Sequence, residues 1–253
     1  MTQKLLLRKA IFAIKALRIT EWRAYVGMAF YGALYNLSDF SNLLNTLPTL
    51  TAGVFLYMSS AYLANNIFDA EGDCLNKKKS TKNPFTTNSL SPAEGLVLLL
   101  ITSSLGVLLI LIVTDLPTSI SYLVGLSLAL MYSIPPIRLK ERTPLDLISH
   151  SIFFGIALVL FGFYLNGNSS LNIYLLIITA LYSAILELRN EIEDIDVDKE
   201  AGYCTTAVVL GYERSIKLLK VLLGVFVLTS FLSLYKIHPL IVVFLATYLS
   251  LIH

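Results

Sequence analysis

Charged residues are scarce in this chain. Of its 253 residues only 14% are Asp, Glu, Lys or Arg, whereas 56% are hydrophobic. This composition is unusual for a soluble domain and favours a protein that lies in a membrane. The sequence also has no signature of nucleic-acid binding, and the net charge of +2 is informative only through where the charges fall.

Cysteine is nearly absent. The two cysteines, Cys74 and Cys204, each follow an acidic motif on the side that we assign below to the cytoplasm. Thiols in a reducing compartment are usually free, so we expect neither a disulfide nor a metal site from this pair. The N-terminus has no short apolar core followed by a cleavage site, and we therefore expect no removable signal peptide.

Long apolar runs are the main feature that is present. Runs of roughly 18 or more apolar residues are typical of transmembrane helices. We predict an all-α integral membrane protein, a multi-span helical bundle that forms one domain over residues 1–253. Residues 1–20 are predicted to form a basic amphipathic helix on the membrane surface, in contact with lipid. The eight predicted spans are 22–40, 48–69, 91–114, 117–136, 144–165, 171–190, 213–235 and 238–252.

Lys and Arg are distributed on one side of this predicted topology. With the N-terminus inside the cell, 18 of the 19 basic residues fall on the inner side and only Lys236 falls outside. Because basic residues concentrate in cytoplasmic segments, this split supports a multi-pass protein of the cell membrane in that orientation. The inner segments are 1–23, 70–90, 137–143 and 189–220.

A polar pattern, N-x3-D-x3-D, recurs at the cytoplasmic ends of two spans. Side chains four residues apart lie on one face of a helix. The second copy has further carboxylates around it, and such a density of like charge is unfavourable without counter-cations, which indicates divalent metal. We predict that both copies bind Mg²⁺. The two motifs consist of Asn65, Asp69, Asp73, Asn190, Asp194 and Asp198.

Basic residues accompany the acidic motifs. Mg²⁺ takes few carboxylates and completes its shell with phosphate oxygens and water, while Lys and Arg offset the remaining phosphate charge. The combination therefore favours a metal–diphosphate complex, although the lysines alone also fit an ordinary cytoplasmic loop. The predicted substrate-binding residues are Asn65, Asn190, Lys82, Arg138, Lys140 and Arg189.

The two halves of the chain have a similar order of elements. Each runs span, span, motif, basic loop, span, span, and the motifs are 125 residues apart, from Asn65 to Asn190. This order suggests an internal duplication with two pseudo-repeated halves around a central cavity. We predict that both motifs face this one cavity.

Three motifs together resemble those of the UbiA superfamily of intramembrane prenyltransferases. They are the repeated N-x3-D-x3-D, the stretch Tyr132-Ser133-Ile134-Pro135-Pro136-Ile137-Arg138-Leu139-Lys140 between the copies, and Gly202-Tyr203-Cys204-Thr205-Thr206 before Gly211. The resemblance covers residues 18–235. There are two departures: the family typically has nine spans, and its usual Arg-Pro near the first span is Arg18-Ile19 here.

The resemblance implies Mg²⁺-dependent transfer of a prenyl group from a prenyl diphosphate to an aromatic, isoprenoid or lipid acceptor, as in isoprenoid biosynthesis. It implies that the motif residues hold the metal, that Lys82, Arg138 and Lys140 contact the diphosphate, and that Tyr132 lines the cavity. We count Asp69, Asp73, Asp194, Asp198 and Tyr132 as catalytic.

Aromatic side chains are expected to shield an allylic carbocation formed when the diphosphate leaves. The candidates for this shielding role are Tyr57, Tyr62, Phe68, Tyr132, Phe161 and Tyr182.

Two other functions stay open at this point. A related membrane terpene cyclase would ionise the same diphosphate and close the chain on itself. A cation transporter with repeated halves would also use acidic residues, but near the middle of the membrane rather than at helix ends beside basic loops.

Overall fold

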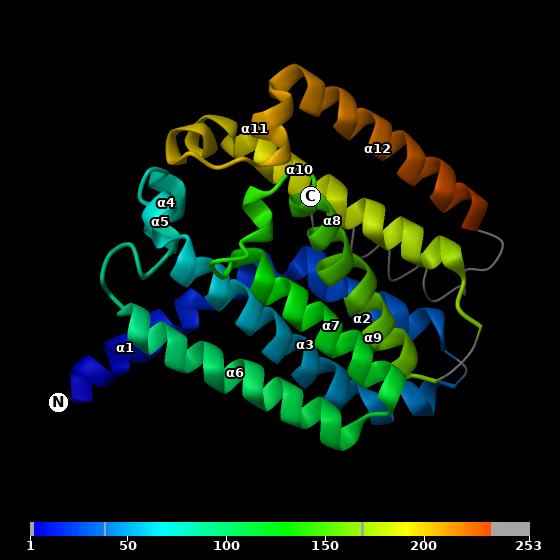
Figure 1. Ribbon diagram of the computed structural model, residues 1–253. Helices are drawn as coiled ribbons and strands as arrows, with labels where there is room; N and C mark the ends of the chain where they lie inside the picture. The colour runs from blue at the N-terminus through cyan, green and yellow to red at the C-terminus, as the bar shows by residue number, and fades with distance from the viewer. Residues whose placement is uncertain (1–2, 38, 168–169, 234–253) are drawn as a thin grey trace.

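The computed structural model describes residues 3–37, 39–167 and 170–233, and every regular element in these residues is helical (Figure 1). The elements are α1 (Gln3–Ala16), η1 (Ile19–Glu21), α2 (Arg23–Tyr35), α3 (Phe40–Phe68), α4 (Ala70–Asp73), α5 (Lys77–Lys82), α6 (Pro92–Val113), α7 (Leu116–Ser133), η2 (Leu139–Glu141), α8 (Leu145–His150), η3 (Ser151–Ile156), α9 (Ala157–Leu165), α10 (Ile173–Ala201), α11 (Thr206–Leu210) and α12 (Tyr212–Ser233).

Six helical segments in the described residues are long and apolar enough to cross a membrane. Five of them are the helices α3, α6, α7, α10 and α12, and the sixth is the continuous segment Leu145–Leu165, which joins α8, η3 and α9. The prediction of an all-α, multi-span membrane protein is therefore confirmed.

The first two predicted spans differ from the observed helices. The predicted span 22–40 corresponds to α2, whose 13 residues measure only ~20 Å, less than the ~30 Å of a hydrocarbon core. Helix α3 begins at Phe40, earlier than predicted, and includes Pro48. The predicted span 238–252 lies outside the described residues.

Local capping residues determine where several spans begin. Ser91 and Glu94 form a reciprocal capping box at the start of α6, with Pro92 in the first helical turn. Asp115 caps α7 and Asn172 caps α10, each accepting a backbone N–H with its side chain. The helices begin at these residues because N–H groups that have no partner within the helix are bound by the cap side chains.

Helices α2 and α9 pack with their backbones in direct contact. A Cβ atom at Gly162 would meet the backbone of Ala29 and Ala33, and one at Gly32 would meet the backbone of Val159 and Phe163. No side chain fits between the helices at this crossing. This contact fixes α2 in the bundle, although the helix itself is short.

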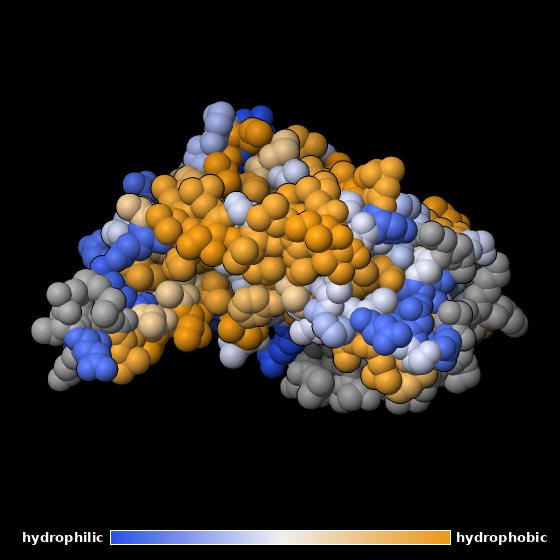
Figure 2. Space-filling view, turned by 90° about the horizontal axis from the view of Figure 1, so that it is seen from below, coloured by the Kyte–Doolittle hydropathy of each residue, from blue (hydrophilic) through white to orange (hydrophobic). Residues whose placement is uncertain are grey.

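The outer helices present apolar side chains to their surroundings. Figure 2 looks at the molecule from the side on which α6 lies lowest in Figure 1, and apolar residues fill the centre of this face. Ile112 on α6 is 78% exposed and Val227 on α12 is 63% exposed. Since lipid is the solvent that such surfaces match, α6 and α12 form the outside of the membrane bundle.

Helix α1 lies beside the beginning of α6, as Figure 1 shows. Lys9 pairs with Glu94, and the Nζ atom of Lys15 donates to the carbonyl oxygen of Thr81 at 2.7 Å. Leu7 and Ile14 on the same helix stay more than half exposed. A basic, half-apolar helix is thus present where one was predicted.

Candidate active site

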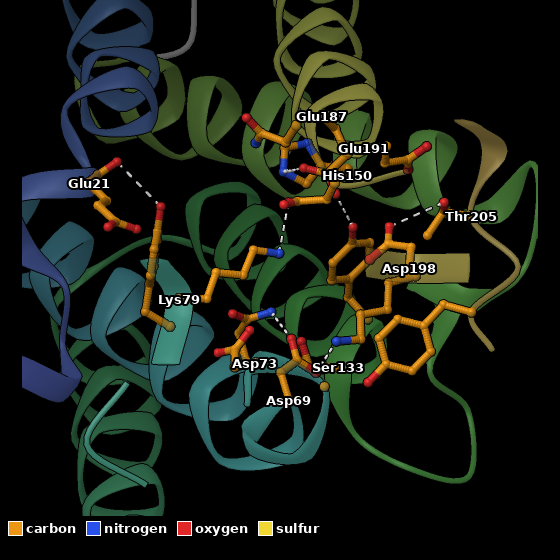
Figure 3. A pocket seen from close by; sticks show the side chains of 18 of the residues that line it. Glu21, Asp69, Asp73, Lys79, Ser133, His150, Glu187, Glu191, Asp198 and Thr205 are labelled. Carbon is orange, nitrogen blue, oxygen red and sulfur yellow. Dashed lines mark hydrogen bonds and ion pairs between the residues drawn. The ribbon is translucent and has the colours of Figure 1, made fainter. Parts of the chain in front are cut away.

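A cavity of about 400 Å³ lies at the end of the bundle where α3 and α10 both finish (Figures 1 and 3). The short helices α4, α5 and α11 lie at the same end. All six residues of the two N-x3-D-x3-D motifs line this cavity, so the prediction that both motifs face one cavity is confirmed.

The first motif is not one continuous helix. Helix α3 ends at Phe68, and Asp69 takes the backbone conformation of a helix cap, with φ −100° and ψ 0°. The spacing of a helix nevertheless continues, because Asp69 N donates to Asn65 O at 2.9 Å and Asp73 N donates to Asp69 O at 2.7 Å. The three motif side chains therefore stay on one face despite the break.

Asp69 is surrounded by donors. Asn65 Nδ2 donates to its carboxylate at 2.6 Å, Lys140 forms an ion pair with it, and an Arg138 nitrogen lies 3.5 Å away. The guanidinium of Arg138 also donates to the carbonyl oxygen of Phe68 at 3.3 Å. These contacts hold the loop after α7 against the end of α3.

Asp73 is held by residues that come from two other segments. Asn83 Nδ2 donates to its Oδ2 atom at 2.9 Å, and a guanidinium nitrogen of Arg18 lies 3.3 Å from the same atom. Arg18 adopts a left-handed backbone conformation, with φ 49°, at the junction between α1 and η1. The chain therefore turns sharply at the residue whose side chain reaches the cavity.

The second motif is helical throughout, because α10 continues to Ala201 before Gly202 ends it in a left-handed conformation. Lys79 Nζ lies 2.8 Å from Asp194, and Asn76 Nδ2 donates to the same carboxylate at 3.2 Å. Thr205 Oγ1 donates to Asp198 at 3.4 Å. The segment that follows the first motif is thus bound directly to the second motif.

Two lysines at the cavity have shifted pKa values. Burial lowers the pKa of Lys140 to about 8, and the charges of Glu141 and Asp198 only partly oppose it. Burial by itself would also lower the pKa of Lys79, but the hydrogen bond and charge of Asp194 outweigh it, so this pKa is raised. Lys79 therefore keeps its proton to a higher pH than Lys140 does.

The basic residues predicted to bind the substrate differ in their position relative to the cavity. Lys82 and Lys140 line the cavity, and Lys82 pairs with Glu21 at 2.8 Å. Arg138 is not a lining residue but contacts Asp69 directly. Arg189 is not brought to the cavity: its side chain is 55% exposed and lies 3.6 Å from Glu193 on the next turn of α10. A helix turns by ~100° per residue, which places Arg189 and Asn190 on different faces.

Aromatic rings line the inner part of the cavity. Of the predicted candidates, Tyr62 and Tyr132 are lining residues, whereas Tyr57, Phe68, Phe161 and Tyr182 are not. Tyr203 of the third motif also lines the cavity, as do three aromatic residues that the sequence did not single out, namely Tyr25, Phe153 and Phe154. The rings of Tyr25 and Phe154 stack with their centroids 4.2 Å apart.

His150 is the clearest functional candidate that the sequence reasoning missed. It lines the cavity and is only 2% exposed, within the apolar segment Leu145–Leu165. An ionisable residue inside a membrane span is costly and therefore usually functional, so its position in an apolar run was the available signal. Figure 3 shows it beside Glu187 and Glu191.

The acidic residues do not form a self-contained metal cage. Within the part of the chain that the structure describes, no three His, Cys, Asp or Glu side chains come together closely enough to hold a metal ion. Mg²⁺ commonly binds through one or two carboxylates, together with water and the phosphates of a substrate. Carboxylates on opposite walls of one cavity, with basic residues between them, fit this mode of binding.

Comparison with known proteins gives a consistent result. The sequence model of the UbiA prenyltransferase family matches residues 25–253. A lycopene elongase/hydratase from Halobacterium salinarum is 27% identical over 201 residues, which cover 77% of this chain and 70% of the relative. One from Haloarcula japonica is 30% identical over 165 residues, which cover 64% of this chain and 52% of the relative.

A solved structure has a similar fold. It is a UbiA homologue from Archaeoglobus fulgidus bound to GPP and Mg²⁺, with a TM-score of 0.78 and 19% identity. The match covers 94% of this chain and 84% of the homologue. At this level of identity the likeness establishes the arrangement of the helices.

Proposed function

We propose that this chain, which belongs to the UbiA prenyltransferase family, is a transferase of alkyl groups other than methyl that moves a prenyl group from a prenyl diphosphate to a hydrophobic acceptor within the membrane. The observation that carries the proposal is the single cavity lined by both acidic motifs, by basic residues between them and by aromatic rings below them. We further propose that the whole chain acts as one domain.

The motif residues would hold the metal that the donor brings with it. Asn65, Asp69 and Asp73 would bind it from one wall, and Asn190, Asp194 and Asp198 from the other. Bound Mg²⁺ neutralises the charge of the diphosphate and makes it a better leaving group. The Archaeoglobus fulgidus homologue, whose structure contains GPP and Mg²⁺, supports this assignment.

Basic side chains would bind the diphosphate oxygens that the metal leaves free. Lys82 and Lys140 line the cavity, and Arg138 contacts the lining residue Asp69. Arg18 and Lys79 join this group because each contacts a motif carboxylate on the cavity wall. Arg189 is left out because it is not a lining residue and its side chain is 55% exposed.

The aromatic wall would protect the reacting carbon. When the C–O bond of the donor breaks, positive charge develops on the allylic carbon, and ring faces stabilise a cation at short range. Tyr132 lies on this wall, with its ring centroid 5.1 Å from that of Phe153. The same rings exclude water, which would otherwise capture the cation.

The acceptor is proposed to be a lipid-soluble isoprenoid rather than an aromatic acid. Both relatives are lycopene elongase/hydratases, and their names describe action on a long polyene. We also propose that the cavity faces the cytoplasm, because 18 of the 19 basic residues lie on that side of the predicted topology.

The test uses the purified protein in lipid nanodiscs with Mg²⁺, a ¹⁴C-labelled prenyl diphosphate and an extract of membrane isoprenoids. We expect labelled diphosphate to be consumed and an acceptor to gain the mass of the prenyl group. Asp69→Asn and Asp194→Asn should abolish both changes, whereas the exposed Glu71→Gln and Asp196→Asn should not.

Two results would contradict the proposal. A labelled product that forms without any acceptor would indicate a terpene cyclase. Metal-dependent ion flux across liposomes without diphosphate consumption would indicate a transporter.

A further inference from the structure

A buried polar group lies below the acidic motifs, in the inner part of the cavity. Tyr132 donates to one carboxylate oxygen of Glu187, and the Nε2 atom of His150 lies 3.2 Å from the other. At 3.2 Å a ring nitrogen and a carboxylate oxygen require a proton between them. Both oxygens of Glu187 are therefore held by donors.

The second nitrogen of His150 is fixed as well. Its Nδ1 atom lies 2.9 Å from the hydroxyl of Ser183, which also lies 2.8 Å from the backbone carbonyl oxygen of His150. The rings of Phe153 and Phe154 each pack with their centroids 5.1 Å from that of the imidazole. His150 therefore cannot turn away from Glu187 without breaking two polar contacts and a packed aromatic site.

The neighbouring carboxylates have structural partners. Asp146 accepts from both the backbone N–H and the hydroxyl of Thr206. Glu191 accepts from the backbone N–H of Ala207 at 3.0 Å. These two acids hold the beginning of α11. Glu191 and Glu187 both line the cavity, but among the described residues Glu187 makes no such contact with the α11 backbone.

The height of Glu187 on α10 matches a position beside the reacting carbon. It precedes Asn190 by three residues and Asp194 by seven, which corresponds to ~5 Å and ~10 Å along the helix axis. The diphosphate would lie at the level of the motif, and the first carbons of the prenyl chain would extend below it. Glu187 thus faces the region where the acceptor would meet the allylic carbon.

We propose that Glu187 is the base that removes the acceptor's proton, and that His150 is a positioning residue that keeps this carboxylate directed at the cavity. The inference rests on the proposed function. The C–O bond of the donor breaks and its electron pair leaves with the diphosphate. A π bond of the acceptor forms the new C–C bond, and the electrons of an adjacent C–H bond restore the double bond. The released proton goes to Glu187.

The experiment separates bond cleavage from proton removal. The donor carries ¹⁸O at its bridging oxygen, so return of the cation to the diphosphate moves the label to a non-bridging position without any acceptor chemistry. In the Glu187→Gln protein we expect this exchange to persist with Mg²⁺, while prenylated alkene product falls by ~100-fold or more, the usual contribution of a general base.

His150 is tested by a pair of variants. His150→Gln can still donate to Glu187 and should retain more product formation than His150→Leu, with label exchange preserved in both. The matched control is Asp196→Asn, an equivalent acid-to-amide change at an exposed position on the same helix, which should leave both measurements unchanged. If Glu187→Gln does not fold, Glu187→Asp is measured in the same way and should lose product formation but not exchange.

The possible results are distinct. Wild-type-like product formation in the Glu187 variants overturns the base assignment, and so does a parallel loss of exchange and product in the folded protein. Equal activity of His150→Gln and His150→Leu overturns the positioning role. If the wild-type protein neither exchanges the label nor consumes donor, the proposed function itself fails.

Discussion

The close crossing of α2 and α9 makes Gly162→Ala a sensitive test of the fold around the cavity. A methyl group at this position would lie 2.8 Å from the carbonyl carbon of Ala29 and 3.0 Å from the nitrogen of Ala33, whereas ordinary contacts begin at 3.4 Å. Both neighbours are backbone atoms of a helix, so no side chain can rotate to make room. The two helices must move apart.

Two opposing effects determine how much Gly162→Ala lowers the free energy of unfolding. Overpacking of a rigid interior costs up to ~3 kcal/mol, and replacing Gly by Ala within a helix returns up to ~1 kcal/mol. The net loss is ~2 kcal/mol, or more than tenfold in the folding equilibrium. Because α2 carries Tyr25 and the segment before α9 carries Phe154, the displacement also disturbs the aromatic wall of the cavity.

The measurement is the unfolding midpoint in an SDS titration of the protein in mixed micelles, followed by circular dichroism. Gly224→Ala on α12 is the matched control, because a Cβ atom there meets nothing within 4 Å. We expect Gly162→Ala to unfold at lower SDS and Gly224→Ala to unfold at the same or higher SDS. Equal midpoints for the two variants would refute the close backbone contact.

Three further predictions concern single residues. Cys74 and Cys204 are exposed and unpaired, so an impermeant maleimide should label both in inverted membrane vesicles and neither in intact cells; labelling in intact cells would reverse the proposed orientation. Asn66→Ala should destabilise the protein by ~1–3 kcal/mol, because the fully buried Asn66 donates to the carbonyl of Ala16 at 2.6 Å; an unchanged SDS midpoint would show that this bond contributes nothing. Lys79→Gln should raise the KM for prenyl diphosphate while label exchange at saturation is retained; an unchanged KM would place Lys79 outside the donor site.

Much of the membrane architecture could be predicted because it depends on local sequence. Long apolar runs and capping residues such as Ser91 and Asp115 act within a few residues of themselves. The two motifs could likewise be placed on one face from their spacing alone. That both copies line one cavity was predicted from the repeated order of elements in the two halves of the chain.

The remaining features depend on contacts between distant segments. The close packing of α2 against α9 joins residues more than 120 positions apart, and no local pattern in the sequence indicates it. The members of the aromatic wall that were not predicted, Tyr25, Phe153 and Phe154, come from α2 and η3 and look like ordinary apolar residues in the sequence. Arg189 shows the opposite case, since a basic residue next to a motif in sequence is not a lining residue of the cavity.

The lipid-facing character of α6 and α12 has a consequence for how this protein can change in evolution. Many of their apolar side chains are exposed in the described part of the chain, so exchanges among Leu, Ile, Val and Phe at those positions alter neither packing nor solvation appreciably. Neutral substitutions can therefore accumulate along these helices while their apolar composition stays constant. Distant relatives would then share identical residues around the cavity. Along the two outer helices they would share little more than a high content of apolar residues.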